Sequence, residues 1–161
     1  MAKNIPLSTI GVKISYAVEI TAGSRPTTDF TRIHGIYSTP DFNIAPSTAD
    51  ATSFDNLEYT AKIALLKEMP DTVDFGVRLG TTFVAEWKAL VQAYETAKAS
   101  NKEVWFCIDI PDIVEAIYFT GQPIKLGLSA MEANSGIDTT AYVAPTGEPV
   151  FGTKPTYTAE N

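Results

Sequence analysis

The chain contains little of what most catalytic and metal-binding sites require. It has one cysteine, Cys107, and one histidine, His34. A single cysteine cannot form an internal disulfide, which suits synthesis in a reducing cytoplasm, and one histidine is too few for a histidine-based metal cluster. Glycine-rich phosphate-binding motifs of the GxGxxG and Walker types are also missing. We therefore expect no catalytic residue, no cofactor and no metal ion.

Long apolar runs and clusters of basic residues are missing as well. No stretch approaches the roughly 18 apolar residues of a membrane-spanning helix, and the start of the chain lacks the apolar core of a secretory signal. Lys and Arg number 12 against 19 Asp and Glu, a formal net charge of −7. This charge disfavours binding of DNA or anionic membranes by phosphate neutralisation. It indicates either an acidic, well-solvated surface or a wall that repels a polyanion.

The few reactive side chains lie in surroundings typical of structural roles. His34 lies in an expected strand with isoleucines nearby, and Cys107 lies among aromatic and aliphatic residues, where a thiol is usually buried and inert. A Cys107–His34 pair on neighbouring strands would lack a third group. Asp109 and Asp112 bracket a proline at a strand end, where carboxylates usually solvate a turn.

What the sequence does contain is regular alternation of apolar and polar residues. Hydrophobic residues make up 45% and aromatic residues 11% of the 161 residues, enough for the core of one domain. Period-two alternation predicts half-buried strands, the first two forming a hairpin. The expected strands cover residues 11–20, 30–37, 73–79, 104–110, 115–120, 124–130 and 136–144. Residues 1–10 are expected to form an extended arm and residues 147–161 a tail without regular structure.

One helix is expected, over residues 82–100, with Thr81 or Thr82 as its N-cap. Its apolar residues follow the spacing of a core-facing stripe: Phe83, Trp87, Leu90, Val91 and Tyr94. Alanines recur beside that stripe from Ala85 to Ala97. They are either good helix formers or a smooth surface for a neighbouring subunit. The sum is a single β-rich α+β domain over residues 1–161.

The segment from Ser38 to Thr72 is far longer than the roughly 2–6 residues that usually join elements in a compact domain. It has no sustained period, and residues 57–69 fit either a strand or a short helix. It is nevertheless rich in apolar side chains, which a solvated or disordered loop would not be: Phe42, Ile44, Phe54, Leu57, Tyr59, Ile63, Leu65, Leu66 and Met69. We predict an arm that packs against another subunit.

The order of these elements resembles that of a known family. A hairpin is followed by an arm containing IYSTPDFNIAPSTADATSFDN, then a strand, one long helix and a strand series ending in TAYVAPTGEPVF. This combination resembles the major tail tube proteins of long-tailed bacteriophages, in particular siphophages, over residues 10–151. Its short motifs are Ser38-Thr39-Pro40 and Pro145-Thr146-Gly147.

The resemblance implies a β-sandwich or partial barrel of about seven or eight mostly antiparallel strands, with the helix at its flank. Such domains form hexameric rings, and the rings stack into a hollow tube through which phage DNA passes. The architecture is shared with the inner tubes of contractile tails and of type VI secretion systems. The family offers no catalytic residues to transfer.

The resemblance also implies partners and a location. The partners are other copies of the chain, the tape measure protein, the tail terminator and the distal tail protein, while DNA passes without specific binding. The protein would be made in the host cytoplasm and reside in the tail of the virion.

The candidates for contact between stacked rings lie in the arm: Asp41, Phe42, Ile44, Phe54 and Asp55. The lead at residues 1–10 and the tail at residues 147–161 are rival candidates. A small carbohydrate- or ligand-binding β-sandwich, with Trp87, Trp105 and tyrosines as a platform, is an alternative function. Others are the tube of a phage-derived bacteriocin and an enzyme that uses His34 or Cys107.

Overall fold

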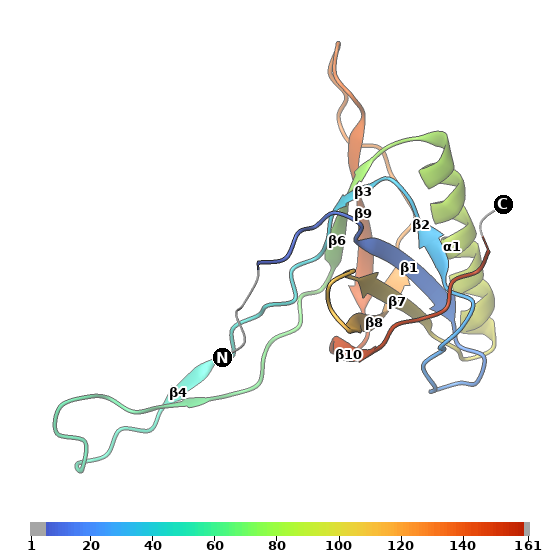
Figure 1. Ribbon diagram of the computed structural model, residues 1–161. Coiled ribbons are helices and arrows are strands. Elements are labelled where there is room, and N and C mark those ends of the chain that lie inside the picture. The colour runs from blue at the N-terminus through green and yellow to red at the C-terminus, as the bar shows by residue number, and fades with distance from the viewer. Residues whose placement is uncertain (1–5, 160–161) are drawn as a thin grey trace.

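The computed structural model describes residues 6–159 and shows an α+β domain in which one helix packs against a curled antiparallel sheet (Figure 1). The sheet forms a half-barrel, as the family resemblance implies. The elements in chain order are β1 (Lys13–Val18), β2 (Thr31–Ile33), β3 (Ile36–Ser38), β4 (Thr48–Asp50), β5 (Lys62–Ala64), β6 (Val73–Arg78), α1 (Thr81–Ala99), β7 (Val104–Asp109), β8 (Glu115–Pro123), β9 (Asp138–Pro145) and β10 (Val150–Thr153).

The strands of the half-barrel follow the order β2-β1-β7-β8-β9-β6-β3, and β10 adds to β8 outside this path. The two edge strands, β2 and β3, are consecutive in the chain. Between them Gly35 adopts a positive φ of 84°, a backbone conformation that glycine accepts without strain. The Gly35 carbonyl accepts a hydrogen bond of 2.8 Å from the Arg78 N–H. The strand expected at residues 30–37 is therefore split: β2 pairs with β1 as predicted, and β3 pairs with β6.

Both faces of the sheet are buried over its central strands. Residues of β1 alternate between them, with Ile14 and Tyr16 facing the main core and Ser15 and Ala17 facing away. The main core lies between the sheet and α1, and three of its phenylalanine rings pack together: Phe75, Phe106 and Phe119. A second, smaller cluster covers the opposite face: Ala17, Phe30, Cys107, Ala116 and Tyr118. The half-barrel is thus a layer with apolar surface on both sides.

Helix α1 buries the predicted stripe against the sheet. Phe83, Trp87 and Leu90 are fully buried, and Val91 and Tyr94 lie partly buried at the edge of the core. The predicted threonine cap is wrong, because the N-cap is Gly80 and no side chain caps the first turn. Along the alanine row Ala97 is buried, whereas Ala85 is exposed.

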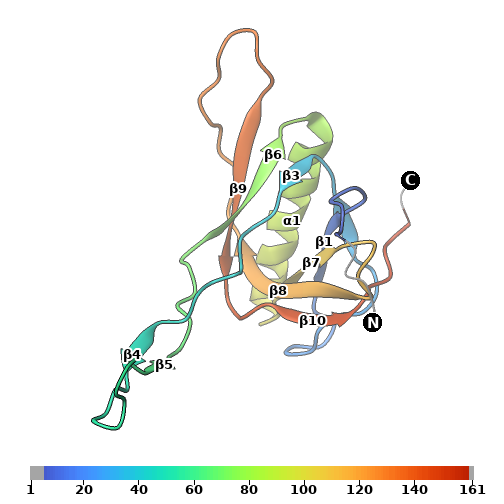
Figure 2. The same ribbon diagram turned by 60° about the vertical axis from the view of Figure 1, so that its left-hand side comes forward.

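The expected turn after residue 120 is wrong. Strand β8 continues through Gly121 to Pro123, and the strand expected at residues 124–130 is instead part of an irregular projection that leads to β9 (Figures 1 and 2). A Cβ placed on Gly121 would come within 2.4 Å of the buried Val143 side chain. The glycine therefore allows close approach of β9 to β8, where the sequence pattern indicated a turn.

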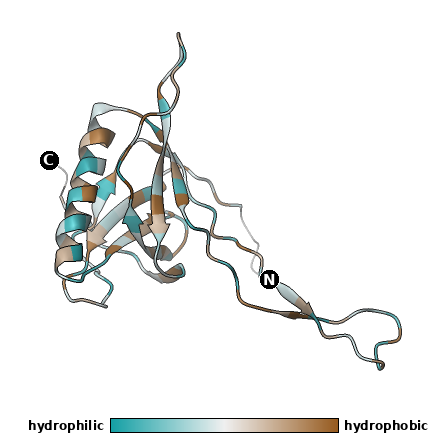
Figure 3. Ribbon diagram, turned by 180° about the vertical axis from the view of Figure 1, so that it is seen from behind, coloured by the Kyte–Doolittle hydropathy of each residue, from teal (hydrophilic) through white to brown (hydrophobic). Residues whose placement is uncertain are grey.

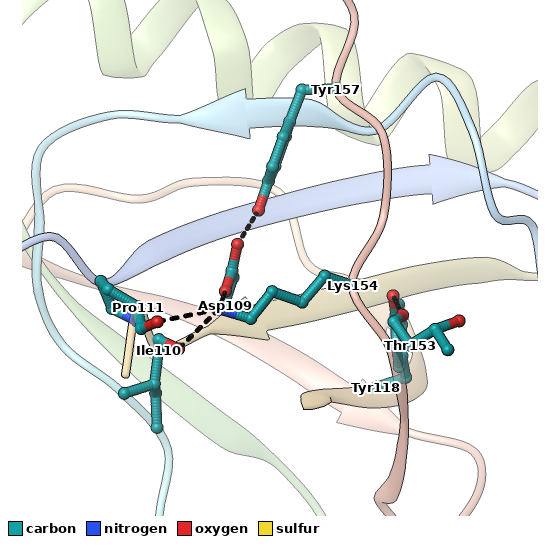
Figure 4. A network of polar contacts seen from close by, with 7 residues as sticks. All are labelled: Asp109, Ile110, Pro111, Tyr118, Thr153, Lys154 and Tyr157. Carbon is teal, nitrogen blue, oxygen red and sulfur yellow. Dashed lines mark hydrogen bonds and ion pairs between the residues drawn. The ribbon is translucent and has the colours of Figure 1, made fainter. Parts of the chain in front are cut away.

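The C-terminal tail is also more regular than expected. Strand β10 pairs with residues 115–118 of β8, and Tyr157 forms a bridge to Phe30. Figure 4 shows the polar contacts that hold this tail. The Lys154 ammonium lies 3.0 Å from the Asp109 carboxylate, and the Tyr157 hydroxyl donates to the same carboxylate at 2.7 Å.

Three further hydrogen bonds complete the attachment of the tail. The Lys154 ammonium also donates to the backbone carbonyls of Ile110 and Pro111, at 3.0 and 3.2 Å, and the Tyr118 hydroxyl donates to the Thr153 carbonyl. Burial raises the pKa of Tyr157, and its bond to Asp109 raises it further. The described part of the tail is therefore fastened to its own domain, over the second apolar cluster.

Candidate assembly site

The arm, residues 38–72, leaves the half-barrel between β3 and β6 and extends away from the domain (Figures 1 and 2). Its two sides form a hairpin, because β4 pairs antiparallel with β5. The pairing continues on both sides of the strands, from Leu65 N–H to the Ser47 carbonyl at 2.6 Å and from Ala51 N–H to the Ala61 carbonyl at 2.9 Å. The arm is therefore a β-stalk that carries a tip, residues 52–60.

Local polar bonds order the tip. The Asp50 carboxylate accepts hydrogen bonds from the Thr52 N–H and hydroxyl, at 3.0 and 2.6 Å, and these bonds lower the pKa of Asp50. The Asn56 side-chain oxygen accepts a bond of 2.8 Å from the Ser53 N–H. Since short side-chain-to-backbone bonds of this kind stabilise turns, the tip has a defined shape without a core of its own.

In the outer arm, which we define as residues 48–66, the large apolar side chains are not buried by the domain. Phe54 is fully exposed, Leu57 is 91% exposed and Leu66 is 90% exposed. Figure 3, coloured by hydropathy, shows apolar residues distributed along the arm far from the core. Large exposed apolar side chains are unusually frequent in this segment, and such concentrations are typical of contact sites. The outer arm is therefore the strongest candidate for self-association in the described chain.

The structure divides the five sequence candidates into two groups. Phe42 packs on Phe119 of its own domain with ring centroids 4.8 Å apart, and Ile44 is half-buried. Asp41 accepts a hydrogen bond from the Asn43 N–H at 2.8 Å, which shapes the base of the arm. Only Phe54 and Asp55 lie at the exposed tip. Leu57 and Tyr59 are also exposed at the tip, and Leu66 is exposed on the domain side of β5; the sequence identified these three only as apolar residues of the arm.

A second projection points away from the arm. Residues 124–137 rise beyond the top of β9, while the arm extends downward and outward (Figures 1 and 2). Leu128 and Met131 are 71% and 61% exposed there. Sequence reasoning missed this feature because it assigned a strand to residues 124–130.

An apolar groove of about 540 Å³ lies between α1 and the base of this second projection. The Trp87 indole N–H donates to the Ile124 carbonyl at 2.9 Å and so ties the two walls together. The lining residues are Leu79, Val84, Trp87, Lys88, Val91, Gln92, Tyr94, Glu95, Pro123, Lys125, Leu126, Gly127 and Leu128.

The reactive side chains have structural partners. The His34 Nδ1 lies 2.6 Å from one oxygen of Glu86, and the His34 N–H donates to the other at 2.7 Å, which fixes the corner next to Gly35. Cys107 is fully buried in the second apolar cluster, where burial raises its pKa to about 11. These contacts join His34 to helix α1, whereas Cys107 lies in the cluster on the other face of the sheet. Within residues 6–159 no group of three or more His, Cys, Asp and Glu is arranged to hold a metal ion.

The tryptophans likewise do not form an exposed platform. Trp87 is 1% exposed, and Trp105 is half-buried against the second cluster, with its indole N–H 3.0 Å from the Glu19 carboxylate. The described helix, α1, is not long and apolar enough to cross a membrane.

Glu19 is the buried carboxylate that joins the end of β1 to the start of β7. It is 3% exposed and accepts bonds from Trp105, from the Gly23 N–H at 2.9 Å and from the Glu103 N–H at 3.2 Å. Burial raises its pKa, but these bonds lower it by more, so the pKa lies below its ordinary value of 4.5. A lowered pKa means that the ionised form stabilises the fold. That contribution is complete above the ordinary pKa and is lost as pH falls through the folded value.

We expect Glu19→Gln to lower the free energy of unfolding at pH 7 by about 1.5–3 kcal/mol, because charge-assisted bonds are lost. The difference from wild type should shrink as pH falls below 4.5, where Glu19 itself becomes protonated. Urea unfolding at several pH values measures both effects, with the exposed Glu115→Gln as the control. A difference that stays constant down to pH 3 would contradict this role of the carboxylate.

Neither a family model nor a curated protein sequence matches the chain.

Proposed function

We propose that this protein is the structural protomer of a phage tail tube. Copies associate side by side into closed rings, which the resemblance makes hexameric, and the rings stack into a hollow conduit for DNA. One observation carries the proposal: an ordered arm presents Phe54, Leu57 and Tyr59 to solvent at the end of a β-stalk. Such an arm has a use in an assembly and none in an isolated domain.

The shape of the domain supports the same proposal. The half-barrel has two projections that point away from each other (Figure 1). A protein whose contact surfaces lie at opposite ends associates head to tail, and such heterologous contacts close into rings or continue as filaments according to the rotation between copies. Ring closure would also cover exposed strand edges, which are otherwise a liability for aggregation.

The charge of the chain supports a conduit through which DNA moves. With a net charge of −7, the protein has no excess of Lys and Arg to hold a polyanion. DNA that is repelled from a wall slides, whereas a basic wall would bind it with steep salt dependence. The partners in this proposal are other copies, the tape measure protein, the tail terminator and the distal tail protein, and the location is the virion tail.

Purified protein is expected to form annuli and hollow rods, since the arm and the sheet edges supply the contacts for both directions of growth. Negative-stain microscopy detects these forms, and sedimentation velocity over a wide concentration range measures their mass. A single monomeric species at every concentration would overturn the proposed function.

A further inference from the structure

We propose that the groove between α1 and residues 123–128 is the receptor for the arm tip of a second copy. The inference rests on the proposed function and adds to it the surface that the arm contacts. Three observations carry it: the placement of the groove, its apolar lining and the charges at its rim.

The groove and the arm lie on different sides of the domain. In Figures 1 and 3 the arm extends from one side of the half-barrel and α1 covers the other. The extended stalk therefore carries the tip away from the groove of its own copy, whereas the groove of a second copy is free to receive it. Because tip and groove are different surfaces, each copy that receives an arm still presents its own, and the contact repeats along a tube.

The apolar lining of the groove is suited to bind the apolar side chains of the tip. The groove contains Val91 and Leu126 beside the buried Trp87, and its volume of about 540 Å³ lies within the range of roughly 300–1,000 Å³ that is typical of occupied pockets. The tip supplies Phe54 and Leu57, both almost fully exposed. Large side chains that fill a pocket at the centre of an interface usually carry most of the binding energy.

The charges at the two surfaces are complementary. Lys88 on α1 and Lys125 on the facing segment line the groove, with Glu95 as its acidic member. The tip carries Asp55 and Glu58, and residues 51–61 contain no Lys or Arg. Opposite charges across an interface steer the encounter and fix the register. The acidic, apolar tip therefore matches a groove that is apolar inside and basic at its rim.

A charge-reversal experiment tests this contact. We expect Lys88→Glu with Lys125→Glu to weaken assembly at least about tenfold in the concentration required, because like charges then face each other. Asp55→Lys with Glu58→Lys should weaken it similarly. The protein that carries all four changes should recover assembly, since the charges are opposite again. Lys98→Glu, on an exposed part of α1 outside the groove, is the matched control, and circular dichroism verifies folding of every variant.

Cysteine cross-linking tests the same contact independently. We expect the variant Leu57→Cys with Leu126→Cys to form a ladder of disulfide-linked oligomers on a non-reducing gel, and each single change to form none. The native Cys107 gives little background because it is fully buried.

The outcomes separate this inference from the proposed function. Recovery by the four-change variant, together with the ladder, supports the groove as the receptor. If Lys88→Glu with Lys125→Glu forms tubes at the same protein concentration as wild type, and the cysteine variant gives no ladder, the groove is not the receptor. The proposed tube would then still stand. Wild-type protein that forms no assembly would overturn the tube itself.

Discussion

A protein in which residues 48–64 are replaced by Asn-Gly is expected to fold as well as wild type and to form no extended tube. The Leu65 N–H bonds to the Ser47 carbonyl at 2.6 Å, the geometry that a two-residue hairpin turn requires between its flanking residues. The shortened arm keeps Phe42 on Phe119 and loses the whole tip. Because shorter loops lose less entropy on folding, by about 0.6 kcal/mol for each halving, the variant should be at least as stable as wild type.

Thermal unfolding and electron microscopy together measure this prediction. The expected result is an unchanged or higher melting temperature with single rings or monomers in place of rods. A matched control keeps the full length of the arm and replaces Phe54, Leu57 and Tyr59 by serine. It should also fail to extend, since the apolar contacts and not the length of the arm drive stacking. Tubes of normal length from the shortened protein would place the stacking contact elsewhere. The lead at residues 1–10 is then the next candidate, because the described part of the tail is fastened to Asp109 of its own domain.

Local pattern was sufficient to predict most of the strands of the half-barrel, whereas the half-barrel itself was implied only by the family resemblance. Alternation predicted β1, β6, β7 and β9, and the spacing from Phe83 to Tyr94 predicted α1, because each depends on residues close in the sequence. Alternation predicted a polar outer face for β1, however, and Ser15 and Ala17 are buried on that side. Their cover is the C-terminal tail, whose attachment depends on Asp109 and Lys154, residues far apart in the chain. No local pattern carries that information.

The same limit explains the features of the site that the sequence did not predict. The arm was predicted as a long apolar segment without a partner in its own domain, but only the fold separates Phe42, which packs on Phe119, from Phe54, which is exposed. Glycine is common in turns, but Gly121 lies within β8, where its lack of a side chain allows Val143 to pack closely. The groove joins α1 to residues 123–128, so it exists only after both elements have packed.

Trp87 is the side chain on which both the core and the groove depend, and Trp87→Ala is expected to lower the free energy of unfolding by about 3–5 kcal/mol. The indole is 1% exposed, stacks on Phe83 with centroids 5.6 Å apart, and donates to the Ile124 carbonyl. Removal leaves a cavity under α1 and an unpaired carbonyl. For a chain of this size, about 2–4 °C is lost for each kcal/mol, so the melting temperature should fall by roughly 10 °C.

Trp87→Phe separates packing from the hydrogen bond. It retains most of the buried ring and removes the bond to Ile124, so we expect a smaller loss of about 1–2 kcal/mol. Urea unfolding measures both variants, and a loss below about 1 kcal/mol for Trp87→Ala would contradict a central place for Trp87 in the core. Because the Ile124 bond also positions the segment that forms one wall of the groove, Trp87→Phe should weaken assembly more than its stability alone would indicate. A folded Trp87→Phe protein that assembles at wild-type concentrations would instead show that the groove wall keeps its shape without this bond.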